Sequence, residues 1–118
     1  MSELISHSES RRKPLMNELN LFQLLCSVDF DGKKQVVKQL ESCFVSTVDA
    51  DGSLELFPVN LENANVSSRV PVEVYGYDSD GVIVHVLLHI VDGLCKELEI
   101  YKDTPTKIAN LPVNWFFY

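Results

Sequence analysis

The stretch Val82–Tyr101 constrains the fold of this chain more than any other part of the sequence. It reads VIVHVLLHIVDGLCKELEIY, two runs of strand length separated by Asp92-Gly93. One set of alternate positions is mainly apolar, including Val84, Val86, Leu88, Leu98 and Ile100, and most of the polar residues fall on the other set, which is typical of β-strands with one buried face. The opposite face carries the side chains of His85, His89, Glu97, Glu99 and Tyr101. The sequence therefore predicts an antiparallel hairpin in a sheet that meets solvent on one side.

The alternation also limits how the two runs can pair. A two-residue loop at Asp92-Gly93 would place Leu88 opposite Glu97 and mix core with solvent. A three-residue loop, Val91-Asp92-Gly93, keeps the faces separate. It pairs Val84 with Ile100, Val86 with Leu98, His85 with Glu99 and His89 with Cys95. Loops of this length carry a left-handed residue at the position of Gly93, so we predict a glycine bulge there.

Two helices are expected before the strands. Apolar residues recur at helical spacing from Asn17 to Val28, and Asn17 or Asn20 would cap the first free amides. A second helix is predicted over Lys33–Glu41, with Asp31 as its cap. The connection is only a few residues long, so the two helices should form a hairpin.

The remaining strands are predicted from shorter runs. Cys43–Val48 and Leu54–Phe57 flank the turn-forming tetrapeptide Asp49-Ala50-Asp51-Gly52, and Val70–Tyr77 precedes a second one, Asp78-Ser79-Asp80-Gly81. Asp103–Tyr118 ends in four aromatic residues, and we expect it to be extended and docked, because an exposed cluster would be a sticky patch. The predicted fold is α+β, with an N-terminal helical hairpin packed on an antiparallel sheet of about five strands built from hairpins.

A single domain accounts for most of the chain. Its hydrophobic fraction of 46% and charged fraction of 23% are near those of globular proteins. Residues 1–15 are polar and have no apolar period, so we expect a mobile tail or an artificial extension there, followed by one α+β domain over 16–118.

The negative charge is concentrated in the predicted sheet. The chain carries a net charge of −7, and the segment Ser42–Asp103 has eleven acidic and three basic side chains, a balance of −8. Nucleic acid is a poor partner for such a surface, because affinity for a polyanion comes from lysine and arginine. A basic protein would suit it, while the plain alternative is that the charge only maintains solubility.

The location is expected to be cytoplasmic. Cys26, Cys43 and Cys95 lie in apolar runs without a CxxC motif, which indicates buried thiols in a reducing compartment. No signal peptide precedes them, and the longest nearly uncharged run, Gly81–Val91, is too short to cross a membrane.

The polar face carries His85, His89, Glu97 and Glu99, residue types that bind metal ions or transfer protons. His85 and His89 are four residues apart on one strand, about 13 Å by the usual rise, so they cannot share an ion. The two D-x-D-G turns have neither the twelve-residue spacing nor the closing glutamate of a calcium loop. No nucleophile, phosphate-loop or zinc-protease motif occurs. We therefore predict a protein that is not an enzyme and holds no metal or cofactor.

The C-terminal half resembles a family of small bacterial proteins with a VHVLLHxVDGxxxELEIYK core. These residues are Val84–Gly93 and Glu97–Lys102, preceded by a DGSLEL hairpin at Asp51–Leu56 and an RVPVE strand at Arg69–Glu73. The resemblance covers residues 21–108. Such proteins are similar to immunity proteins of polymorphic toxin and contact-dependent growth inhibition systems. This resemblance implies an inhibitor that binds the basic domain of a cognate toxin, often a nuclease.

Under that interpretation the partner meets the acidic face and its turns. The expected contact residues are Asp49, Asp51, Glu73, Tyr75, Tyr77, Asp78, Asp80, His85, Glu97, Glu99 and Tyr101. The three tyrosines would anchor the complex and the acids would speed its formation. Two alternatives stay open, a small-ligand-binding protein and a regulatory adaptor of the same class. No direct contact with nucleic acid or membrane is expected, and the protein is predicted to be a monomer or a weak homo-oligomer.

Overall fold

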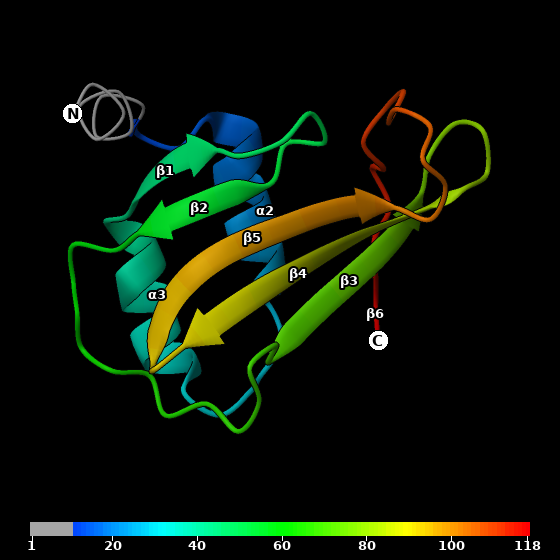
Figure 1. Cartoon of the computed structure of the whole chain (residues 1–118). Helices are drawn as coiled ribbons and strands as arrows, with labels where there is room; N and C mark the ends of the chain where they lie inside the picture. The colour runs from blue at the N-terminus through cyan, green and yellow to red at the C-terminus, as the bar shows by residue number, and fades with distance from the viewer. Residues whose placement is uncertain (1–10) are drawn as a thin grey trace.

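The computed structural model describes residues 11–118 and has the predicted α+β fold class. Its elements are α2 (Met16–Leu25), α3 (Lys33–Glu41), β1 (Phe44–Thr47), β2 (Leu54–Phe57), β3 (Val72–Tyr77), β4 (Ile83–Val91), β5 (Leu94–Lys102) and β6 (Phe116–Phe117). The strands form one antiparallel sheet in the order β1-β2-β5-β4-β3-β6 (Figure 1). This is one strand more than the predicted number of about five, because the aromatic ending adds the short strand β6.

Both helices lie on the same side of the sheet (Figure 1). Their apolar side chains, including Leu25 and Val36, join the inward residues of the strands in one buried cluster. Alternate residues of β3, β4 and β5 supply the sheet's part of it, among them Val74, Val86 and Leu98. The face of the sheet turned away from the helices, called here the outer face, is not covered by either helix. Within residues 11–118, neither helix has the length and apolar character needed to span a bilayer.

The segment before α2 is tied to the sheet edge. Residues 1–10 of the predicted tail lie outside the described residues, but Arg12 exchanges two backbone hydrogen bonds with Val45 of β1, at 2.9 and 2.8 Å. Its guanidinium also forms a two-bond ion pair with Glu18 at 2.8 and 2.9 Å. This pair lowers the pKa of the Glu18 carboxyl. The described part of the segment is therefore anchored at both its backbone and a side chain.

The predicted helix caps were wrong. The residue at the N-cap position of α2 is Leu15, and its amide donates to the Glu18 carboxylate at 2.7 Å. The side-chain acceptor at the start of this helix is therefore Glu18 of the first turn, and not Asn17 or Asn20. Helix α3 begins after Gly32 without a side-chain cap. The Asp31 carboxylate instead accepts a hydrogen bond from the hydroxyl of Ser67, which ties the helix start to the long loop before β3.

The β4–β5 hairpin has a two-residue loop, not the predicted three-residue one. Asp92 and Gly93 both have positive φ, 52° and 79°. Two such residues match the twist of the flanking strands. The register then shifts by one residue at Lys96, a bulge between the pairs Ile90–Cys95 and His89–Glu97. The predicted separation of core and solvent faces is correct, but Val86 pairs with Ile100 and His85 with Tyr101.

A buried glutamine binds the backbone beside this bulge. Gln39 of α3 is fully buried, and its side-chain oxygen accepts the Cys95 amide at 2.7 Å. Its side-chain nitrogen donates to the backbone oxygens of Gly93 and Glu62, at 2.9 and 2.8 Å. One helical side chain thus holds the tip of the hairpin, the bulge and the preceding loop, and leaves no hydrogen-bonding atom of its own side chain unused.

The C-terminal segment is extended and pairs with the sheet, as predicted, but its aromatic cluster is not buried, since Phe116, Phe117 and Tyr118 are 47%, 37% and 69% exposed. It crosses β3 at Gly76 and then pairs with β3 as strand β6, with Phe116 opposite Tyr75. A Cβ atom placed on Gly76 would lie 2.6 Å from the Pro112 Cβ and 2.8 Å from the Asn114 backbone oxygen. These distances are shorter than van der Waals contact, so only glycine allows the crossing.

We expect Gly76→Ala to destabilise the protein by about 1–2 kcal/mol, because the added methyl group must displace the crossing segment. Urea unfolding measures the free energy, and amide exchange locates the change. Protection should fall at Phe116 and Tyr118, whose amides face β3, and stay unchanged in α3. Gly81→Ala is a contrasting variant, because Gly81 lies in the β3–β4 turn and the added carbon has no atom within 4 Å, so its φ of 83° strains only that turn. It should leave the exchange of β6 unchanged.

Candidate functional site

The outer face gathers the polar and aromatic side chains of four strands. Seven of the predicted contact residues point to it, namely Glu73, Tyr75 and Tyr77 from β3, His85 from β4, and Glu97, Glu99 and Tyr101 from β5. They alternate with the buried residues of the same strands, which explains why local pattern predicted them. Strand β6 adds two residues that were not predicted, Phe116 and the following Tyr118.

His85 lies at the centre of this face and is hydrogen-bonded through both ring nitrogens. Its Nε2 is 2.7 Å from Oδ1 of Asp103, and its Nδ1 is 2.7 Å from the hydroxyl of Tyr118. A carboxylate only accepts, so Nε2 donates to Asp103, and a neutral imidazole then accepts the Tyr118 proton at Nδ1. The expected pair of His85 with Glu99 is wrong. Glu99 contacts the other histidine, His89, at 2.7 Å.

The aromatic rings form a continuous surface around this histidine. Tyr101 stacks on His85 with ring centroids 4.5 Å apart and planes 12° apart. Tyr75 contacts the rings of Tyr118 and Phe116, at 4.9 and 5.4 Å. We call Tyr75, Tyr77, Tyr101, Phe116 and Tyr118 the aromatic patch. Tyr77 and Tyr118 are 52% and 69% exposed, so the patch offers apolar area to solvent.

Carboxylates surround the aromatic patch. The pKa of Tyr101 is raised, first by burial and then by the negative charges of Glu73, Asp103 and Glu99. The pKa of Tyr118 is raised for the same kind of reason, with burial again the main cause. Both phenols therefore keep their protons at neutral pH, and that of Tyr118 donates to His85. The Asp103–His85–Tyr118 chain is suited to fixing the side chains of the patch in place.

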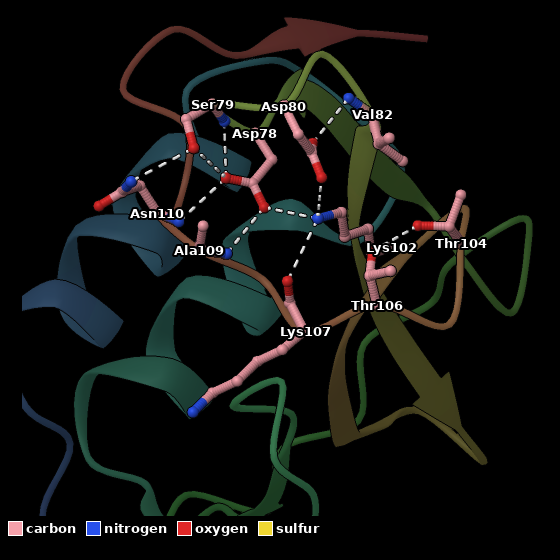
Figure 2. A network of polar contacts seen from close by, with 10 residues as sticks. All are labelled: Asp78, Ser79, Asp80, Val82, Lys102, Thr104, Thr106, Lys107, Ala109 and Asn110. Carbon is pink, nitrogen blue, oxygen red and sulfur yellow. Dashed lines mark hydrogen bonds and ion pairs between the residues drawn. The ribbon is translucent and has the colours of Figure 1, made fainter.

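Asp78 and Asp80, two further predicted contact residues, bind a lysine of the same chain (Figure 2). The ammonium of Lys102 lies 2.9 Å from Asp78 and 2.7 Å from Asp80. The side chain of Asp78 is 0% exposed, and its carboxylate also accepts the amides of Ala109 and Asn110. Asp78 is thus not available to a partner, and the prediction for it was wrong. Asp80 stays partly exposed at the edge of the network.

The remaining predicted residues, Asp49 and Asp51, lie in the β1–β2 turn. Asp49 closes that turn, since its carboxylate accepts the amides of Asp51 and Ser53, both at 3.0 Å. Both acidic tetrapeptides are hairpin turns, as predicted. Among the described residues, no three His, Cys, Asp or Glu side chains gather where they could hold a metal ion.

A surface groove lies apart from the aromatic patch. It has a volume of about 600 Å³ and lies between the loop 63–69 and the tip of the β4–β5 hairpin, including Ile90 and Asp92. A second groove of about 310 Å³ lies between α2 and α3 and is lined mainly by apolar side chains such as Phe22 and Leu40. Neither groove includes His85 or a member of the patch.

The fold and this surface define a two-layer α+β protein whose sheet has one open face. Residues 11–112 match the family model described as a domain of unknown function, DUF6984, and the chain belongs to this family. No curated protein and no solved structure gave a match. The matched region includes the outer-face residues of β3, β4 and β5 but ends before Phe116 and Tyr118.

Sequence reasoning missed Asp103 and Tyr118, although a signal existed for each. Asp103 continues the outward alternation of Glu97, Glu99 and Tyr101, one step beyond the end of β5. Tyr118 belongs to the aromatic ending, whose docking was expected but whose strand partner was not. Its contact with His85 joins residues 33 positions apart, a separation that no local pattern reports.

Proposed function

We propose that this protein is a cytoplasmic immunity protein that neutralises a cognate bacterial toxin by binding a basic domain of it through the outer face. The observation that carries the proposal is the open sheet face with exposed aromatic side chains surrounded by carboxylates. A monomer seldom leaves such a patch uncovered without using it. Resemblance to immunity proteins supports the same function.

The chemistry of the face suits a tight complex with a basic protein. Aromatic side chains that are buried on binding supply much of the affinity at protein interfaces. Carboxylates around them would attract a basic partner over long range and favour the correct orientation. A nuclease domain is a fitting partner, because its substrate-binding surface must itself be basic.

A second candidate, small-ligand binding, draws on the groove of about 600 Å³ beside the hairpin tip. The groove is lined by polar residues of the loop 63–69, including Asn65 and Ser67. Its volume falls within the range of small-molecule sites. This groove is separate from the outer face, so substitutions there distinguish the two candidates.

Co-expression tests the main proposal. We expect the protein to protect a host that produces the toxin encoded beside its gene, and to elute with that toxin as one complex in gel filtration. Glu73→Gln, Glu97→Gln and Glu99→Gln together should slow association by about tenfold or more at low salt, with a smaller change in dissociation. Asn65→Leu in the groove is the control and should change neither rate. An unprotected host together with no complex would contradict the proposal.

A further inference from the structure

We infer that the outer face recognises its partner through arginine, with a guanidinium group stacked on Tyr101 and hydrogen-bonded to a flanking carboxylate. The inference deepens the proposed function and rests on it for the identity of the partner. It specifies that the outer face binds arginine in preference to lysine, whereas attraction by net charge alone would not distinguish the two side chains.

The protein already holds one guanidinium on an aromatic ring of this sheet. The guanidinium carbon of Arg11 lies 3.7 Å from the centroid of the Phe57 ring. Phe57 alternates with the buried Leu54 and Leu56 and therefore belongs to the outer face. A cation above a ring at this distance is attracted by the negative face of the π-system. The contact is an internal example of the recognition that we infer at Tyr101.

Tyr101 is the ring best prepared for the same contact. It is 37% exposed, and its stacking on His85 fixes its orientation. Glu99 in β5 and Asp103 just after its end flank Tyr101, each about 7 Å away by the usual strand rise. These distances allow a guanidinium above the ring to reach one carboxylate or the other, while a third acid, Glu73, adds negative charge from β3.

Histidines hold both flanking carboxylates in position. His85 binds one oxygen of Asp103 and His89 binds one oxygen of Glu99, each at 2.7 Å. Within residues 11–118, the hydrogen bonds of these two acids engage only Oδ1 and Oε1, so Oδ2 of Asp103 and Oε2 of Glu99 can accept from a partner. A carboxylate held in advance loses less freedom on binding, which raises affinity.

Arginine fits this arrangement better than lysine does. Its planar guanidinium can stack on a ring and donate to a carboxylate at the same time, and it is less strongly hydrated than an ammonium. Lysine provides a single point charge that must give up more hydration to enter the same place. The preference for arginine should therefore depend on the ring of Tyr101, while the general attraction of cations depends on the acids.

Two peptides of equal charge test the inference, hexa-arginine and hexa-lysine, titrated by calorimetry into the full chain at low salt. We expect hexa-arginine to bind at least fivefold more tightly. Tyr101→Leu should reduce the ratio of the two dissociation constants to near one, whereas Tyr101→Phe should keep it. Glu99→Gln should weaken the binding of both peptides. Glu62 is an exposed acid in the loop beside α3, so Glu62→Gln is the matched control and should weaken the binding of neither peptide.

The outcome separates this inference from the proposed function. Equal affinities for the two peptides, or a preference that survives Tyr101→Leu in a folded variant, would overturn the arginine contact even if the toxin complex forms. Thermal unfolding and chemical shifts of the core verify folding. Arginine selectivity without protection from the toxin would support the inferred chemistry and reject the toxin as the partner.

Discussion

Replacing Gln39 with leucine is expected to lower the free energy of unfolding by about 2–3 kcal/mol, because the buried amide of Cys95 loses its acceptor and an unpaired buried donor keeps its full desolvation cost. Leucine has nearly the same volume, so the loss reports on hydrogen bonding more than on packing. The Gly93 oxygen also accepts the Ala64 amide at 2.9 Å and stays paired. Urea unfolding followed by circular dichroism measures the change.

Gln35→Leu is the matched control for this variant. Gln35 lies one turn earlier on α3, and its side chain donates a hydrogen bond to the exposed carboxylate of Glu62, at 3.3 Å. Its replacement should change stability by less than about 0.5 kcal/mol, as surface substitutions usually do. In Gln39→Leu, amide exchange should rise most at Cys95 and the hairpin tip. Equal effects of the two substitutions would mean that the bulge is stable without its helical acceptor.

The contacts of Gln39 also show which part of the fold could not be predicted from the sequence. Strict alternation was enough to separate inward Val86 and Leu98 from the outer face, and the apolar period of α3 predicted both of its ends. The register was wrong because the hairpin uses a two-residue turn and places its extra residue at Lys96. The acceptor that supports this bulge is 56 positions away in the chain, so no window of local sequence contains the reason.

Alternation likewise predicted much of the candidate site and could have predicted more. Glu73, Tyr75 and Tyr101 lie on the outer face because their strand neighbours are core residues. Lys102 follows Leu98 and Ile100 on the inward side, so a lysine at that position required buried acids near it. Asp78, assigned to a partner from its place in an acidic turn, is one of those acids.

Lys102→Met is expected to lower the midpoint of thermal unfolding by about 10 °C, because breaking a covered ion pair leaves the remaining charge without compensation. Lys102 and Asp78 are 2% and 0% exposed at their side chains. Methionine keeps the apolar stem of the lysine, so the variant removes mainly the ammonium and its three contacts, including the Lys107 backbone oxygen at 3.2 Å. The network ties the β3–β4 turn to the loop that follows β5 (Figure 2).

Lys107→Met is the control, because this exposed lysine contributes only its backbone oxygen to the network and its replacement should leave the midpoint nearly unchanged.

The dependence of stability on pH provides a second test of the ion pair. Lys102, followed by the Ala109 and Asn110 amides, lowers the pKa of Asp78 below its ordinary value of 3.8. A carboxyl group whose pKa is lowered by folding stabilises the folded state fully at pH values above its ordinary pKa. This stabilisation is lost as the pH falls from the ordinary pKa towards the lowered one. The difference between wild type and Lys102→Met should therefore narrow below about pH 4, and a difference that stays constant into acid would show that the lysine acts through packing alone.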